Sequence, residues 1–148
     1  MIIIRIWDYR LLPYLPDAQF KGQLRELVLI MHQWRDKGTT NHLLINKVME
    51  YEKAELVAYF FDYEAQYQMR YKKKLNKYLK EFIEFEEVEI DKKESYKEDW
   101  HNKEYLRVCM ANLYEKHFFG VGKSRITDEE WETLCRGYKE ITGEEYVI

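Results

Sequence analysis

The chain has 148 residues, of which 46% are hydrophobic and 16% aromatic, with only six glycines and two prolines. This composition excludes a disordered chain and predicts a single domain spanning residues 1–148 with a sizeable core. The net charge is −3: residues 1–50 carry seven Lys+Arg and five Asp+Glu, and residues 51–148 carry seventeen and twenty-two. Only the N-terminal third can therefore supply a basic surface for nucleic acid, and a basic pocket for a small anionic ligand fits equally well.

Apolar, cysteine and histidine patterns exclude several further classes. Arg5 and Asp8 interrupt the hydrophobic start, and no apolar run is long enough to cross a bilayer, so we expect neither a signal peptide nor a membrane partner. Cys109 and Cys135 lack CxxC spacing, which is typical of a reduced cytoplasmic protein. The histidines have no i, i+4 partner and no nearby cysteine, so the sequence predicts no metal site and no cofactor.

The first 16 residues are predicted to form an N-terminal arm. Pro13 and Pro16 each fix φ and remove a backbone donor, which predicts an ordered, non-helical conformation for residues 8–16. Such a segment must pack on another element. We expect it to fold back on the helix that follows.

That helix is expected to begin with Asp17 as its N-cap and to end at Gly38. Its apolar stripe comprises Phe20, Leu24, Leu27, Val28, Met31 and Trp34, and its opposite side comprises Gly22, Arg25, Glu26, Leu29, His32 and Gln33. A solvated surface is the simplest interpretation of the opposite side. Gly22 in a helix interior and Leu29 among polar residues favour instead a face that another segment covers.

Further helices are predicted along the rest of the chain. Residues 39–41 can cap a short helix through Met49, and a long helix is expected from about Ala54 into the lysine run 72–74. Residues 81–99 fit either a helix that frays near Asp91 or a short strand. Helices are also expected at Lys103–Lys116 and Asp128–Ile141, the latter with a capping box of Thr127 and Glu130. The predicted fold class is all-α: a compact helical bundle with the N-terminal arm packed against the first helix.

The segment Gly120–Ser124 superficially resembles a phosphate-binding loop. The glycine that this motif needs at position 118 is replaced by Phe118, and no strand is predicted before it. We interpret the segment as an ordinary loop.

The adjacent pair Arg25 and Glu26 carries the clearest chemical signal. A carboxylate beside a guanidinium suits reaction at a sugar carbon, because the carboxylate stabilises developing positive charge and the arginine orients a phosphate. A free α-amino group has a pKa of about 7.7–8.0 and is substantially unprotonated at neutral pH. A chain terminus near Glu26 could therefore form a Schiff base with C1′ of a nucleotide.

Three sequence segments together resemble the pyrimidine-dimer DNA glycosylase family of endonuclease V-type excision enzymes and its bacterial relatives. They are Arg5-x-Trp7 with the Leu-x-Pro-x-Leu-Pro arm at 11–16, Gly22-Gln23-x-Arg25-Glu26, and His101-Asn102-x-x-Tyr105-Leu106-x-x-Cys109-x-x-Asn112-Leu113-x-x-Lys116. The resemblance spans much of the first 116 residues. Residues 117–148 look like an extension specific to this chain.

The resemblance implies a helical domain that binds damaged duplex DNA, flips a base, attacks the sugar with its N-terminal amine and cleaves the strand by β-elimination. Glu26 and the amine of Met1 would be catalytic, and Arg25 would bind phosphate. By the same analogy, the nucleotide or phosphate pocket would include Arg5, Trp7, Lys21, His32, Asn46 and Lys47.

Two departures from the family pattern support an alternative function. Ile2–Ile4 precede the Arg-x-Trp segment and could move the terminal amine by up to about 10 Å. Leu29 stands where phage-type members carry a basic residue. The leading hypothesis is a DNA glycosylase/AP lyase acting on damaged pyrimidines. The alternative is an inactive relative that sequesters a nucleotide or nucleotide-derived signal, in the manner of a phage anti-defence protein. A structural helical protein with a surface Arg25–Glu26 pair is the third interpretation.

Overall fold

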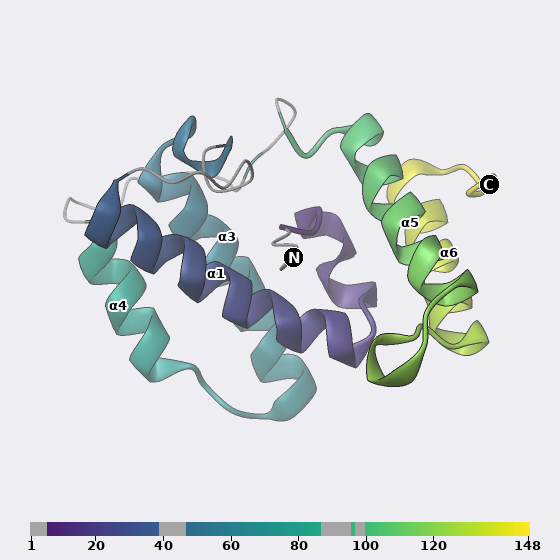
Figure 1. Ribbon diagram of the computed structural model, residues 1–148, viewed down its shortest axis with the longest axis horizontal. Helices are drawn as coiled ribbons and strands as arrows, with labels where there is room; N and C mark the ends of the chain where they lie inside the picture. Colours follow the sequence, from purple (N-terminus) through teal and green to yellow (C-terminus); the bar gives the residue numbers. More distant parts are fainter. Residues whose placement is uncertain (1–5, 39–46, 87–95, 97–99) are drawn as a thin grey trace. The chain divides into compact units, whose positions relative to one another are not determined.

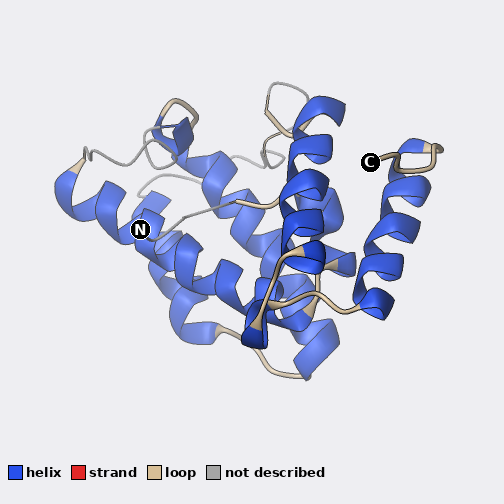
Figure 2. Ribbon diagram, turned by 45° about the vertical axis from the view of Figure 1, so that its right-hand side comes forward, coloured by secondary structure: helices blue, strands red, loops and turns tan. Residues whose placement is uncertain are grey.

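The computed structural model describes residues 6–38, 47–86, 96 and 100–148, and every regular element among them is helical (Figures 1 and 2). These elements include the 3-10 helices η1 (Tyr9–Tyr14) and η2 (Gly122–Ser124) and the α-helices α1 (Asp17–Lys37), α3 (Lys53–Tyr71), α4 (Asn76–Glu86), α5 (Lys103–Phe118) and α6 (Asp128–Thr142). Residues 47–49 are also helical. The predicted all-α class is confirmed.

Contacts within the chain divide it into two compact units, and the single domain expected from the sequence stays a prediction. Unit 1 comprises residues 1–6 and 23–97, and unit 2 comprises residues 7–22 and 98–148. The boundary crosses α1, so its first six residues belong to unit 2 and the remainder to unit 1.

Unit 1 contains most of α1 together with α3 and α4, and α3 packs against α4. The rings of Phe60 and Phe82 stack in its core with their centroids 4.1 Å apart. Leu27 and Met31 of the predicted stripe of α1 are fully buried, and so is Ile30, which the prediction left out. The 3.6-residue periodicity of α1 thus places its apolar stripe inward, as predicted.

The long helix predicted to enter the lysine run ends instead at Tyr71. Lys72 adopts a left-handed conformation with φ 57° and donates its backbone N–H to the Gln68 carbonyl. The buried Glu64 carboxylate accepts from the Gln68 side chain at 2.6 Å. This reversal separates α3 from α4, which confirms helix for residues 81–86; the predicted fraying near Asp91 lies outside the described residues.

Unit 2 corrects the predicted conformation of the arm. Residues 9–14 form a 3-10 helix that includes Pro13, because the Asp8 side chain caps it by accepting from the Arg10 backbone N–H at 3.0 Å. Within unit 2, η1 packs against α6. A Cβ atom on Gly137 of α6 would lie 2.4 Å from the Tyr14 ring, so glycine permits this close packing.

The helix ends follow local sequence signals closely. α1 begins at Asp17 rather than after it, since the Pro16 carbonyl accepts the first helical bond from Phe20. α5 extends two residues beyond the predicted Lys116, and α6 runs one residue beyond Ile141. The predicted Thr127–Glu130 capping box is confirmed. No helix in the described part of the chain is long and apolar enough to cross a membrane.

Candidate active site

Glu26 is held by a chain of hydrogen bonds that begins in the core of unit 1. The Tyr59 hydroxyl of α3 donates to Oε1 of Gln23 at 3.1 Å, and Nε2 of Gln23 donates to Oε2 of Glu26 at 3.3 Å. Tyr59 and Gln23 are fully buried, whereas Glu26 is half-buried. The carboxylate therefore lies at the boundary between core and solvent, supported from the inside.

The donors and acceptors in this series of hydrogen bonds fix the orientation of the Gln23 side-chain amide. Its oxygen accepts from a phenol and its nitrogen faces a carboxylate, so an inverted amide would place oxygen against oxygen. A buried amide oriented from both ends loses little freedom when a substrate binds. The arrangement is suited to presenting one carboxylate oxygen in a constant position.

Arg25 lies next to Glu26 on α1 and is exposed. Leu29, one turn further, is 38% exposed, and a covering segment over this face stays a prediction. Two turns beyond Arg25, the imidazole Nε2 of His32 lies 2.9 Å from the carboxylate of Glu81 on α4. This hydrogen bond is the main reason that the pKa of Glu81 lies below its ordinary value. One side of α1 thus presents an exposed guanidinium and then a paired histidine.

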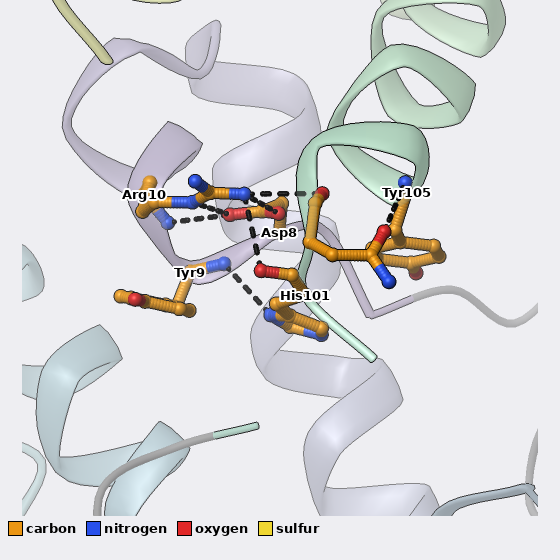
Figure 3. A network of polar contacts seen from close by, with 6 residues as sticks. Asp8, Tyr9, Arg10, His101 and Tyr105 are labelled. Carbon is orange, nitrogen blue, oxygen red and sulfur yellow. Dashed lines mark hydrogen bonds and ion pairs between the residues drawn. The ribbon is translucent and has the colours of Figure 1, made fainter. Parts of the chain in front are cut away.

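A second polar network lies in unit 2, around residues of the third segment of the family resemblance (Figure 3). Arg10 forms two hydrogen bonds to the fully buried carboxylate of Asp8, at 3.0 and 2.9 Å. Its guanidinium also donates to the backbone carbonyls of His101 and Asn102, each at 3.1 Å. The Asn102 side chain in turn caps α5 by accepting from the Tyr105 backbone N–H.

His101 is the buried centre of this network. Its Nδ1 accepts from the Tyr9 backbone N–H at 3.1 Å, so a neutral ring carries its proton on Nε2. Burial, assisted by the positive charge of Arg10, lowers the pKa of His101 to about 3. A histidine that stays neutral at physiological pH acts here as a structural acceptor, which ties the start of η1 to the start of α5.

Sequence comparison places the chain in a known family. The sequence profile described as pyrimidine dimer DNA glycosylase matches residues 4–84, more than half of the 148-residue chain. The chain belongs to the pyrimidine dimer DNA glycosylase family. No curated protein and no solved structure matches the chain significantly.

The family match covers α1, α3 and most of α4, and therefore the whole Tyr59–Gln23–Glu26 chain. It ends before His101, so the third segment of the predicted resemblance lies outside the matched residues. α5 and α6 also lie beyond the match. The interpretation of residues 117–148 as an extension specific to this chain stays a prediction.

The remaining predicted pocket residues are paired with carboxylates, buried, or outside the described residues. Lys47 pairs with Glu50 at 3.4 Å. In unit 2, Lys21 pairs with Asp17 at 3.2 Å and Trp7 is buried, with 4% of its surface exposed. Each lysine therefore carries a local counter-ion, and Trp7 is a core residue of unit 2. Met1, Arg5 and Asn46 lie outside the described residues.

The sequence analysis assigned no role in the candidate site to Gln23 or Tyr59. A signal for Gln23 was present, since it lies on the buried side of α1, three residues after Phe20 and four before Leu27. A polar residue at such a position requires a hydrogen-bond partner. Tyr59 had no comparable signal, because nothing in the sequence around it distinguishes it from the other twelve tyrosines. Within the described ranges, no group of three or more His, Cys, Asp or Glu could hold a metal ion.

Proposed function

We propose that the protein is a DNA glycosylase/AP lyase that acts on damaged pyrimidines in duplex DNA. The observation that carries the proposal is the position of Glu26, which lies within the family match and is held by Gln23 from the core. A family of DNA glycosylases requires a carboxylate near the sugar, and a buried amide supplies the rigidity that such a group needs.

The proposed reaction uses the N-terminal amine as nucleophile. Its lone pair forms a bond to C1′ while the glycosidic bond breaks, and the base leaves with that electron pair and takes up a proton. Opening of the sugar ring gives an iminium ion between the amine nitrogen and C1′. Loss of a proton from C2′ then breaks the C3′–O3′ bond, and the 3′-phosphate leaves.

Glu26 has two tasks in this scheme. Its carboxylate stabilises the positive charge that develops at C1′, and it accepts the proton lost from C2′. Arg25, exposed beside it, is suited to holding a phosphate of the same strand through its forked donors. Both side chains leave α1 in consecutive positions, so one helix presents the charge-stabilising and phosphate-binding groups together.

Borohydride trapping tests this proposal. The protein is incubated with a duplex that contains one abasic site, and borohydride reduces any iminium to a stable covalent adduct. We expect an adduct with the wild type and a trapping rate at least about 100-fold lower for Glu26→Gln. The matched control is Glu84→Gln, which alters an exposed carboxylate of α4 and should leave the rate unchanged. Peptide mapping should locate the adduct on the N-terminal residue.

The opposite results would overturn the proposal. Absence of any adduct, or equal rates for Glu26→Gln and the wild type, would exclude the lyase chemistry. Native mass spectrometry on the same preparation would then test nucleotide sequestration, for which a co-purifying nucleotide is the expected sign.

A further inference from the structure

The connection between α5 and α6 exposes a contiguous apolar surface. Phe118 and Phe119 are 64% and 73% exposed, and Val121 is 82% exposed. The two phenylalanine rings pack edge to face, with centroids 4.8 Å apart. Burying even one of these side chains would be favourable, so such a cluster in a folded protein commonly marks an interaction surface.

Hydrogen bonds close the base of this connection. The Ile126 N–H donates to the Lys116 carbonyl at 3.2 Å, and Nδ1 of His117 lies 3.0 Å from the Ile126 carbonyl. On the other side, the buried Gln19 donates from Nε2 to the Ser124 carbonyl at 2.9 Å. The apolar side chains are thus exposed on a closed loop, not on a frayed helix end.

Close packing and ring stacking support the same base. A Cβ atom on Gly120 would lie 2.0 Å from the Lys116 carbonyl oxygen, so only glycine fits there. The His117 ring stacks on Trp131 of α6 with an interplanar angle of 8°. Phe118 stacks on Tyr114 one turn earlier in α5. These interactions orient the loop, which we call the 118–125 loop.

Positive charge accompanies the apolar surface. Residues 116–127 include Lys116, Lys123 and Arg125 and no carboxylate. Lys123 and Arg125 are exposed, and no carboxylate among the described residues pairs with either. The acidic residues that follow are the first turn of α6, where Asp128 faces His117 and Glu130 caps the Thr127 N–H. The loop therefore offers two exposed cations beside three exposed apolar side chains.

We propose that the 118–125 loop is a wedge that binds duplex DNA, with Phe119 and Val121 entering between base pairs and Lys123 and Arg125 binding the adjacent phosphates. The inference rests on the proposed function in requiring a DNA substrate. An enzyme that acts on a stacked base must first open the duplex, and apolar side chains inserted at a base step lower the cost of unstacking. The loop lies outside the family match, so this interaction would be a property of the C-terminal part of this chain.

Duplex binding by loop variants tests the wedge. Fluorescence anisotropy would measure affinity for a duplex with one abasic site, and 2-aminopurine beside that site would report unstacking. We expect Phe119→Ser/Val121→Ser to weaken binding at least about tenfold and to abolish the 2-aminopurine signal of the wild type. Met69→Ser, which alters a 67% exposed side chain of α3, is the matched control.

The proposed phosphate contacts of Lys123 and Arg125 predict a change in the salt dependence of DNA binding. Lys123→Gln/Arg125→Gln should reduce the slope of log affinity against log salt concentration by about 2, close to one for each phosphate that the variant no longer neutralises. Lys80→Gln, an exposed lysine of α4, is the control and should leave the slope unchanged. Circular dichroism of each variant checks that the helices persist.

Trapping on single-stranded abasic DNA separates this inference from the proposed function. No duplex needs opening in that substrate, so the Phe119→Ser/Val121→Ser protein should trap it at the wild-type rate while it traps duplex more slowly. Failure of the wild type to trap either substrate would refute the lyase chemistry alone, since the binding measurements do not need it. Unchanged duplex affinity and salt slope in the loop variants, or no duplex binding by the wild type, would overturn the wedge and leave a protein partner as the occupant to seek.

Discussion

Tyr59 of α3 donates a hydrogen bond to Gln23 of α1 at 3.1 Å, and both side chains are fully buried. The bond joins residues 36 positions apart in the sequence. The bond acts on Glu26 indirectly: it orients the Gln23 amide, and that amide donates a hydrogen bond to the Glu26 carboxylate. The positions of these two residues make Tyr59 a positioning residue for the proposed catalytic carboxylate.

Replacing Tyr59 by phenylalanine should affect stability and rate together. The variant leaves Oε1 of Gln23 buried without this donor, which we expect to cost about 1–3 kcal/mol in the free energy of unfolding. The released amide can rotate, so the trapping rate at saturating DNA should fall while DNA affinity changes little. Urea unfolding and single-turnover trapping measure the two effects. Tyr78→Phe, which removes a hydroxyl from a half-buried tyrosine of α4, is the control. Loss of stability without loss of rate would contradict the positioning role.

The His32–Glu81 pair predicts a small pH-dependent stabilisation. A carboxyl group whose pKa is lowered in the folded state stabilises the protein above its unfolded pKa, and this contribution is lost as pH falls through the folded pKa. The pair is partly exposed, so we expect Glu81→Gln to cost less than about 1 kcal/mol at pH 7. Urea unfolding at pH 7 and at pH 3 should show the difference between variant and wild type disappearing in acid. A difference that persists at pH 3 would show that packing, not charge, is responsible.

His101 is a basic group that is buried in its neutral form, so unfolding should let it take up a proton. Its pKa is about 3 in the folded protein, below the ordinary value of 6.5, so the unfolded state binds the extra proton between these two pH values. The free energy of unfolding should therefore fall as pH decreases from 6.5 toward 3, by up to about 1.4 kcal/mol per pH unit from this group. His101→Gln retains an acceptor for the Tyr9 N–H and removes the titration. Unfolding curves at several pH values should be flatter for the variant; identical slopes would contradict the burial of a neutral imidazole.

Gly137 is predicted to tolerate no side chain while Tyr14 is present. Alanine normally favours a helix over glycine by about 1 kcal/mol, but its Cβ would meet the Tyr14 ring at 2.4 Å. We expect Gly137→Ala to lower the unfolding free energy by about 1–3 kcal/mol through overpacking. Thermal unfolding measures the loss. Tyr14→Leu/Gly137→Ala should recover stability relative to Tyr14→Leu alone, and no recovery would show that the clash is not the cause.

Local sequence signals predicted most helix positions in this protein. The Thr127–Glu130 box begins α6, and Asn102 caps α5, where the sequence predicted a helix beginning at Lys103. The break at Lys72 was missed, because a left-handed lysine has no strong sequence signature and Leu75 continues the apolar spacing of α3. The 3-10 helix η1 was missed because Pro13 suggested a non-helical arm, whereas Asp8 as a cap permits a short helix.

The sequence by itself determined the helical class, most helix ends and the family, because caps, 3.6-residue spacing and motif order act over short stretches of chain. Tertiary structure alone decided that Tyr59 holds Gln23, which in turn holds Glu26. It also decided that η1 packs on α6 and that His101 is buried beside Arg10. These relationships join residues up to 92 positions apart, as in the Tyr9–His101 bond. A polar side chain shows in the sequence that it needs a partner, but only the folded chain brings that partner within hydrogen-bond distance.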